Sequence, residues 1–501
     1  MPRRRFLLYL TIASLLAGAA LYLATAPLGA GVSEDSAKYM SAAENLVVGR
    51  GLYMYNREPM TQWPPGYPAV LAGLHWLTGL DVFVVGGWLN IVLFAANLGL
   101  SGWLFWRLFG PRVYTYVAPL LVCTSLGLLS AAVTIASDPL FLTLVLCFLL
   151  AGEATLRQPR RRTLALLGCL AALAPLERYV GVSLVAAGAA LVFAAARGTW
   201  LRRAGRAAAF GALASLPLLA WVYGRNVALT GSAFGPRAFV APWLNLMLSV
   251  EKVVSWFVPD LILRFIPPAA VLLAAVALWW WLAGRNGRAA FASAVRTPAV
   301  LPHLAFVLAY LLVLAFTSSY FEFRVVGFNR IHAILLPSLL ILAGVALQPL
   351  PQLARRGGLL LARLVLAALL LFTGYRAQKY LRIVAAEGDP IFNLANTATL
   401  QQSALVSYLQ NTHALQEAEL YSNNEAVLWF YTRQPVGRVP RAGQPSDWPL
   451  GRQGYMVWFL GSLDYKYGLV PPDEFAGRGW LTPVFSDALG VVYALSAPAS
   501  E

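Results

Sequence analysis

Residues 1–27 decide the class of the protein and read MPRRRFLLYLTIASLLAGAALYLATAP. Three arginines precede an uncharged run of roughly 20 residues, the length that an α-helix needs to cross a bilayer. A basic start before an apolar run is also typical of a signal peptide. This run is longer than a signal core and many apolar runs follow it, so we predict an uncleaved first spanning helix with a cytoplasmic N-terminus.

The composition of the whole chain supports a membrane protein. Hydrophobic residues make up 59% of the sequence, charged residues only 12%, and the mean hydropathy is +0.64. A soluble domain would carry about twice that charge, so the surplus apolar surface must face lipid. The three cysteines lie in apolar runs without metal-ligand spacing and read as small hydrophobic residues: Cys123, Cys147 and Cys169.

Further apolar runs follow along the chain, and we predict an α-helical polytopic protein with an inside N-terminus and an outside C-terminus. The predicted spans number about eleven and lie near 6–27, 82–107, 113–133, 138–156, 163–176, 179–196, 207–223, 265–283, 299–317, 330–348 and 358–375. The run at 66–79 is too short to cross and follows Trp63-Pro64-Pro65, so we predict a juxtamembrane helix there.

The distribution of charge tests this topology independently. Every predicted cytoplasmic segment is basic, as the positive-inside rule requires: Arg3 to Arg5, Arg107, Arg112, Arg157, Arg160 to Arg162, Arg197, Arg202, Arg203, Arg206, Arg285, Arg288, Arg296, Arg355 and Arg356. The net charge of +16 therefore indicates contact with anionic membrane lipids and no nucleic-acid partner. Among the acids before residue 380, only Glu153 falls inside. Because acids do not set topology, their location indicates chemistry at the outer face.

The composition changes near residue 377, after which no run is long enough to span. We predict a transmembrane module at 1–376, with its first outer loop at 28–81, and a small extracytoplasmic α/β domain at 377–501. Expected strands are Glu419–Ser422, Tyr455–Leu460 and a hairpin within Pro483–Leu495, and expected helices are Asn424–Thr432 and Pro472–Gly477.

The first outer loop carries the most informative motif. Ser33 is suited to cap a helix whose first turn holds Glu34 and Asp35, with Tyr39 on the same face as Asp35. By itself this pattern predicts only a capped amphipathic helix on the membrane surface. The segments Ala43-Glu44-Asn45-Leu46, Gly49-Arg50-Gly51-Leu52 and Trp63-Pro64-Pro65-Gly66-Tyr67-Pro68 follow.

The order of these residues resembles the first outer loop of the GT-C membrane glycosyltransferases, in the bacterial branch near protein O-mannosyltransferases and aminoarabinose-lipid A transferases. Later segments resemble further motifs of that family, with Glu177 in place of Thr and Ile331 in place of Tyr. They are Ser137-Asp138-Pro139-Leu140-Phe141, Leu176-Glu177-Arg178-Tyr179-Val180-Gly181, Arg225-Asn226 with Gly231, Gly235 and Arg237, and Arg330 with Pro337. The similarity extends over nearly the whole chain.

The resemblance implies transfer of a sugar from a polyprenyl-phosphate donor to an acceptor, with inversion, on the outer face of a bacterial inner membrane. Such a displacement needs a carboxylate that takes the proton of the acceptor hydroxyl. The resemblance assigns this role to Asp35. The leaving phosphate needs positive charge, for which Arg178 is the first candidate, followed by Arg225, Arg237 and Arg330.

Other roles stay open at this point. Asp138 and Glu34 are candidates for orienting the acceptor or holding a divalent cation, Mg²⁺ or Mn²⁺, although helix capping accounts for both. Lipid head-group contact accounts equally well for Arg225 and Arg237. The acceptor is a lipid, a glycan or a protein, and a transporter or lipid-binding protein is the alternative function. Residues expected to line the cavity are Tyr39, Trp63, Tyr67, Tyr179, Asn226 and His332.

Overall fold

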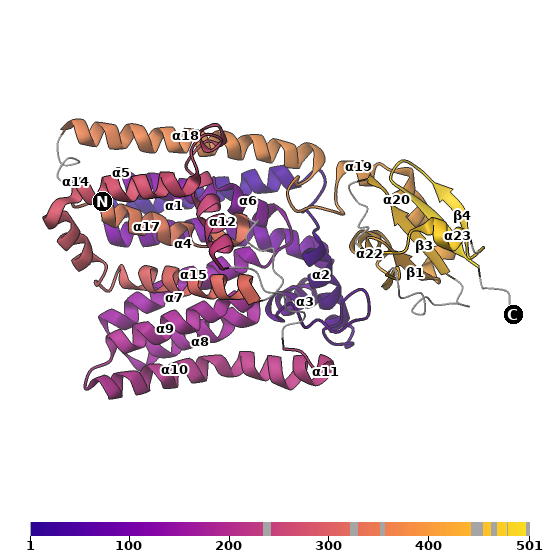
Figure 1. The fold of residues 1–501 in the computed structure, drawn as a ribbon, viewed down its shortest axis with the longest axis horizontal. Coiled ribbons are helices and arrows are strands. Elements are labelled where there is room, and N and C mark those ends of the chain that lie inside the picture. The colour runs from indigo at the N-terminus through magenta and orange to yellow at the C-terminus, as the bar shows by residue number, and fades with distance from the viewer. Residues whose placement is uncertain are drawn as a thin grey trace.

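The computed structural model describes residues 2–233, 242–320, 329–350, 356–441, 454–461, 468–477 and 479–496. The chain forms a long helical bundle and a small α/β unit at one end of it (Figure 1). The N-terminus lies at the other end of the bundle.

The bundle consists of long apolar helices. Within the described ranges, seven are long and apolar enough to cross a membrane, or up to eight if the bent pair α5 (Val113–Cys123) and α6 (Leu126–Val133) forms one span. The seven include α1 (Pro2–Thr25), α4 (Val82–Phe109), α7 (Asp138–Arg157), α10 (Trp200–Trp221), α14 (Pro268–Ala294), α15 (Leu301–Tyr320) and α18 (Arg356–Glu387). Their outward leucines are exposed, as at Leu213 (68%) and Leu371 (74%), which identifies the chain as a multi-pass membrane protein.

Each of the predicted spans lies on a helix or on consecutive helices. Three of the predicted runs fall on shorter ones: α8 (Arg161–Glu177), α9 (Val182–Ala195) with the single turn η1 (Tyr179–Gly181), and α17 (Leu336–Leu347) with α16 (Asn329–Ala333). The number of eleven crossings and the side of each loop stay predictions.

Small residues bring the helices close together. A Cβ on Gly102 of α4 would lie 2.3 Å from Leu10 of α1, and one on Gly188 of α9 would lie 2.6 Å from Phe210 of α10. In lipid, such close backbone approach and interhelical hydrogen bonds hold helices together. Asn97 of α4 supplies one of these bonds, to the carbonyl oxygen of Pro139 on α7 at 2.8 Å.

The first outer loop folds as two helices at the end of the bundle. α2 (Glu34–Val47) has the predicted cap, and α3 (Gly66–Thr78) is the predicted short juxtamembrane helix, only 13 residues long. The helix α12 (Pro242–Ser255) packs against α14 and α15.

The α/β unit contains a five-stranded sheet in the order β2-β1-β3-β5-β4. Strands β1 (Glu419–Ser422), β2 (Val436–Arg438) and β3 (Gly454–Phe459) are parallel, and β4 (Leu481–Ser486) and β5 (Gly490–Leu495) form an antiparallel hairpin on β3. The predicted strands, the predicted hairpin and the helices α22 (Glu425–Thr432) and α23 (Pro472–Ala476) are confirmed within two residues. The short strand β2 and the helices α19 (Ala398–Gln401), α20 (Ala404–Asn411) and α21 (His413–Gln416) were not among the predicted elements.

The two parts are joined by the segment that follows α18. The predicted boundary at 376/377 falls inside α18, which continues to Glu387. After it, the backbone N–H groups of Leu394 and Ala395 donate to the carbonyl of Val32, and Val436 of β2 donates to the carbonyl of Tyr55 at 3.0 Å. The outer unit is therefore docked directly onto the first outer loop.

Candidate active site

Helix α2 presents Asp35 at the end of the bundle that carries the α/β unit. Ser33 and Ser36 cap the start of α2 reciprocally, and the Ser36 hydroxyl donates to the carbonyl of Ile135 at 2.6 Å. This bond fixes the first turn of α2 against the segment that leads into α7. The cap thus determines both where the helix begins and where its acidic first turn points.

The Asp35 carboxylate is held by two side chains from other segments. Arg330 of α16 donates from Nη2 to Oδ2 at 2.6 Å, and the Trp63 indole donates to Oδ1 at 3.0 Å. The Asp35 side chain remains 29% exposed. A partly accessible carboxylate fixed by two donors is oriented and still reachable by a substrate.

Asp138 forms the second half of the cluster. It is the first residue of α7, its side chain is 1% exposed, and its Oδ2 lies 2.8 Å from Nη1 of Arg178 and 4.0 Å from Nη1 of Arg330. Within the described part of the chain, Asp138 Oδ1 has no hydrogen-bond partner. Asp35, Arg330, Asp138 and Arg178 therefore form one chain of alternating charges, which we call the outer charge cluster.

A tight turn positions Arg178. Arg178 ends α8, its backbone N–H bonds to Ala174, and its carbonyl accepts from Gly181 at 2.7 Å. A Cβ on Gly181 would lie 2.3 Å from the backbone of Ala174, so only glycine fits there. The Arg178 guanidinium also donates to the Ser137 hydroxyl at 3.0 Å, which aims it at the start of α7.

The segment after α18 contacts Arg330. The Arg330 guanidinium lies 4.7 Å from the ring centre of Phe392, a cation–π contact. Asp389 fixes this segment because its carboxylate accepts from Tyr380, Thr134 and the backbone N–H groups of Ile391 and Phe392 at 2.7–3.1 Å. Asp389 was not among the predicted site residues. The only sequence feature that points to it is its position as an acid soon after the last apolar run.

Two of the predicted cavity-lining tyrosines lie beside the outer charge cluster. The hydroxyl of Tyr39 is 3.4 Å from that of Ser137, and its ring meets Tyr67 edge to face at 5.2 Å. The Tyr67 hydroxyl donates to Asn90 at 3.2 Å. Both rings are buried, and the hydrogen bond of Tyr67 ties them to α4.

A second group of predicted site residues holds the first outer loop instead of reaching the cluster. Tyr179 and Asn226 both donate to the carbonyl of Thr61, at 2.8 and 3.0 Å. Arg225 donates from Nη1 to the carbonyl of Met60 at 2.6 Å and from Nη2 to that of Leu52 at 2.7 Å. Both terminal nitrogens of Arg225 thus bind the loop, and neither of these bonds reaches the outer charge cluster. Its role in binding the donor phosphate stays a prediction.

The remaining predicted residues lie further away. His332 is fully buried and its Nε2 lies 3.0 Å from the hydroxyl of Ser249 on α12. Glu34 pairs with Lys38, one oxygen lying 2.5 Å from Nζ, and its side chain is 49% exposed. Arg237 lies outside the described residues.

Lys38 was not among the predicted site residues, yet it contacts the site. Its Nζ lies 3.9 Å from the centre of the Trp63 ring, whose indole N–H binds Asp35. The spacing of Glu34 and Lys38, one helical turn apart on a predicted helix, could have identified their ion pair but not the contact with Trp63.

The charges around Asp35 determine its ionisation. Burial favours the neutral acid, but Arg330, Lys38 and Arg178 outweigh burial and lower the pKa of Asp35 below its ordinary value. Asp35 is therefore a carboxylate at neutral pH, the state that a general base requires.

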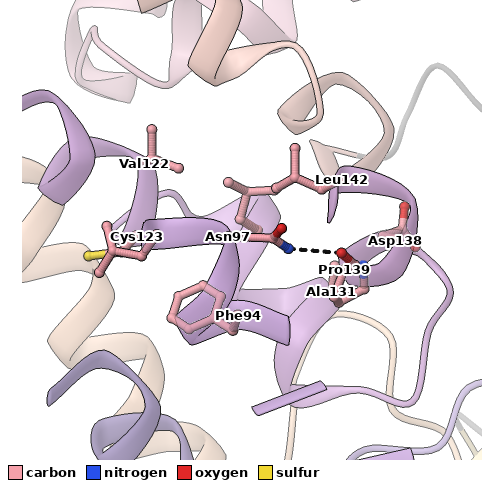
Figure 2. A pocket seen from close by; sticks show the side chains of 10 residues that line it. Phe94, Asn97, Val122, Cys123, Ala131, Asp138, Pro139 and Leu142 are labelled. Carbon is pink, nitrogen blue, oxygen red and sulfur yellow. Dashed lines mark hydrogen bonds between the residues drawn. The ribbon is translucent and has the colours of Figure 1, made fainter. Parts of the chain in front are cut away.

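A narrow apolar crevice, lined in part by Asp138, lies between α4, α5, α6 and α7, where Asn97 bonds to Pro139 (Figure 2). Its space is about 10 Å³, room for a single water at most. No group of three or more His, Cys, Asp or Glu side chains among the described residues is arranged to hold a metal ion. The carboxylates of Asp35 and Asp138 are bridged by Arg330, and the Mg²⁺ or Mn²⁺ site stays a prediction.

Comparisons with known proteins bear on the fold. Neither a protein-family model nor a curated protein matches the chain. Among solved structures, ArnT from Cupriavidus metallidurans bound to undecaprenyl phosphate is similar, with a TM-score of 0.63 and 16% identity over 98% of each chain. The apo form of that ArnT gives a TM-score of 0.58 at 16% identity, over 96% of this chain and 97% of that one.

The oligosaccharyltransferase of Archaeoglobus fulgidus, in complex with Zn and sulfate, is also similar. Its TM-score is 0.51 at 12% identity, over 89% of this chain and 67% of that one. Both are GT-C glycosyltransferases, one an aminoarabinose-lipid A transferase. The chain therefore has the GT-C fold.

Proposed function

We propose that this protein is a glycosyltransferase of the bacterial inner membrane, which moves a sugar from a polyprenyl-phosphate donor to an acceptor hydroxyl on the extracytoplasmic side. The observation that carries the proposal is the outer charge cluster, in which four segments of the chain bring two carboxylates and two guanidiniums into a row whose successive members lie 2.6–4.0 Å apart. The undecaprenyl phosphate bound to the similar ArnT supports a polyprenyl phosphate as the carrier.

Asp35 acts as the general base. The acceptor hydroxyl loses its proton to Asp35 while its oxygen bonds to the anomeric carbon of the donor sugar. The bond between that carbon and the phosphate oxygen breaks at the same time, and its electron pair leaves with the lipid phosphate. Because attack and departure occur on opposite faces, the anomeric configuration inverts. Trp63 keeps one Asp35 oxygen oriented during this step.

Arg178 and Arg330 stabilise the leaving group. A planar guanidinium offers several N–H donors to a phosphate and cannot lose its charge. The two guanidiniums share Asp138, at 2.8 and 4.0 Å, so that they are held as a pair before substrate binds. Preorganised charge at the place where negative charge develops lowers the barrier. No general acid is needed because a phosphate departs readily once its charge is balanced.

Asp138 acts as a positioning residue in this proposal. It is buried and anchors Arg178, and burial of a paired carboxylate at the start of a helix is also favoured by the helix dipole. A direct contact between Asp138 and the acceptor or a metal is not required by this chemistry.

Transfer of label from a polyprenyl-phosphate sugar tests the proposal. We expect purified wild-type protein to transfer the sugar to acceptors in an envelope extract, and Asp35→Asn to lose transfer by at least about 10²-fold while still binding the donor. Glu58→Gln, which changes an exposed acid of the same loop, is the matched control and should transfer normally. Full activity of Asp35→Asn would remove the catalytic assignment, and donor binding by the wild type without any transfer would indicate a lipid-binding protein instead.

A further inference from the structure

A polar cavity of about 220 Å³ lies between the first outer loop and the α/β unit. We propose that it binds a neutral sugar residue of a glycan acceptor, an inference that rests on the proposed transferase function. One wall comes from the first outer loop and the other from the α/β unit. The polar and aromatic residues that line it are Glu34, Tyr55, Asn423, Asn424, Glu425, Arg438 and Arg441.

The topology of the sheet places this cavity where α/β units bind ligands. Asn423 to Glu425 directly follow β1, and Arg438 is the last residue of the neighbouring parallel strand β2. Ligands of open parallel sheets bind outside the carboxyl ends of the strands, where loops and helix N-termini converge. Asn423 makes this edge rigid, because its amide donates to the carbonyl of Phe459 at 2.9 Å and accepts from the N–H of Phe459 at 2.8 Å.

The lining has the chemistry that a sugar requires. Sugar hydroxyls donate and accept hydrogen bonds, so a sugar site needs fixed acceptors and fixed donors together. Glu425 is 92% buried at its side chain and is held by Arg438, at 2.6 Å from Nε and 3.4 Å from Nη2. Tyr55 adds an aromatic ring to the lining, and Arg441 is an exposed donor at the rim.

A short chain of contacts connects this cavity to the proposed base. Glu34 lines the cavity and precedes Asp35 in the chain, and its carboxylate binds Lys38 at 2.5 Å. Lys38 in turn covers the ring of Trp63, which donates to Asp35. An acceptor sugar held here would therefore be linked to the proposed base through Glu34, Lys38 and Trp63.

The balance of charge favours a neutral sugar over an anion. Two carboxylates, of Glu34 and Glu425, face two guanidiniums, of Arg438 and Arg441. A neighbouring cavity of about 450 Å³ has the opposite character, because Arg50, Arg57 and Arg433 line it with a single acid, Glu44. An anionic ligand would therefore bind in the neighbouring cavity rather than beside Glu34 and Glu425.

Binding of methyl glycosides to the full-length protein in detergent micelles, followed by ligand-observed NMR, tests this assignment. The probes are the methyl glycosides of glucose, mannose, galactose and N-acetylglucosamine, with inorganic phosphate as the anionic comparison. We expect at least one glycoside to bind saturably, and Glu425→Gln and Glu34→Gln to weaken it roughly tenfold, because each removes a charged acceptor. Arg50→Gln, in the neighbouring cavity, is the matched control and should leave glycoside binding unchanged.

Because Glu425 is buried, Glu425→Gln could weaken binding by disturbing the fold of the α/β unit. Arg441→Gln changes an exposed lining residue, so it removes a donor from the cavity without disturbing that fold. The proposal is overturned if no methyl glycoside binds the wild type, if the cavity variants bind glycosides as the wild type does, or if phosphate rather than a glycoside is the ligand lost in them. Donor transfer is measured separately. If the protein binds a glycoside but transfers no sugar, the proposed function fails and the cavity assignment stands. If it transfers sugar but binds no glycoside, the cavity assignment fails and the proposed function stands.

Discussion

At the scale of single residues, the site depends on how Asp35 and Asp138 are paired. Asp35 stays 29% exposed and binds Arg330 and Trp63, whereas Asp138 is 1% exposed and binds Arg178. An accessible carboxylate is available for chemistry, and a buried one fixes its partners in place. The sequence assigned Asp35 as the general base through the family resemblance and left the role of Asp138 open, and in the fold the two acids have different surroundings.

The pH dependence of transfer follows from the lowered pKa of Asp35. The base works when ionised, so its activity is present above the folded-state pKa and is lost as the pH falls through it. Because that pKa lies below the ordinary value of 3.8, kcat/KM should show no acid limb between about pH 5 and 8.

Arg330→Gln should move the acid limb to higher pH. Burial raises the pKa of Asp35, and without the Arg330 charge less positive charge opposes that effect. The pH profile of kcat/KM for both proteins is the measurement. A wild-type limb near pH 6, or an unshifted limb in Arg330→Gln, would contradict the assignment of Asp35 as the base.

The pair of Arg178 and Asp138 predicts a specific pattern of stability. Arg178→Ala removes the nearest positive partner of the buried Asp138 carboxylate, leaving only Arg330 at 4.0 Å, and should destabilise the protein by about 3 kcal/mol. Adding Asp138→Asn removes that charge and should restore much of the loss. Thermal unfolding of the two single variants and the double variant measures this coupling, and purely additive effects would show that the two residues are not paired.

At the scale of elements, short-range signals were enough to predict many helices and strands. The capping residues of α2, the hairpin turn before β5 and the proline-rich start of α3 each appear within a few residues of sequence. β2 was not predicted because it has only three residues and is fixed by its neighbour β1. A strand of that length has no periodicity of its own to read.

The turn between α8 and α9 should tolerate no side chain at Gly181. A methyl group there would lie 2.3 Å from the backbone of Ala174, so Gly181→Ala must displace the turn that carries Arg178. A displacement of 1 Å can cost about 10²-fold in rate, and we expect transfer to fall by that order.

Gly73→Ala is the control for this substitution. Gly73 lies in α3 with no atom within 4 Å of an added Cβ, so the change should be neutral or slightly stabilising. Transfer rates and thermal unfolding of both variants are the measurements. Unchanged transfer in Gly181→Ala would mean that this turn does not position a functional residue.

At the scale of the whole molecule, the site is assembled from segments far apart in the chain. Asp35 and Arg330 are separated by 295 positions, and their contact at 2.6 Å follows only from the packing of the bundle. Sequence motifs identified both residues separately but could not show that Arg330, rather than Arg225, reaches Asp35. Asp389 was not identified at all because its role is to hold a segment, and that role has no local pattern.

Asp389 should couple the outer segment to the site. Its carboxylate is 2% exposed at the residue level and accepts four hydrogen bonds, so Asp389→Asn replaces acceptors with a donor facing other donors. We expect a loss of about 1–3 kcal/mol in stability and weaker donor binding, because Phe392 then supports Arg330 less well. Thermal unfolding and the KM for donor measure both effects.

Asp473→Asn, at an exposed acid of the outer unit, is the control, and equal effects in the two variants would argue against a specific role for Asp389.

A cryo-electron microscopy structure of Asp35→Asn protein with a polyprenyl-phosphate sugar tests the central claim most directly. The account predicts the phosphate within hydrogen-bond distance of Arg178 and Arg330, with the anomeric carbon facing the side chain at position 35. A phosphate bound away from both arginines, or a sugar turned away from position 35, would contradict it.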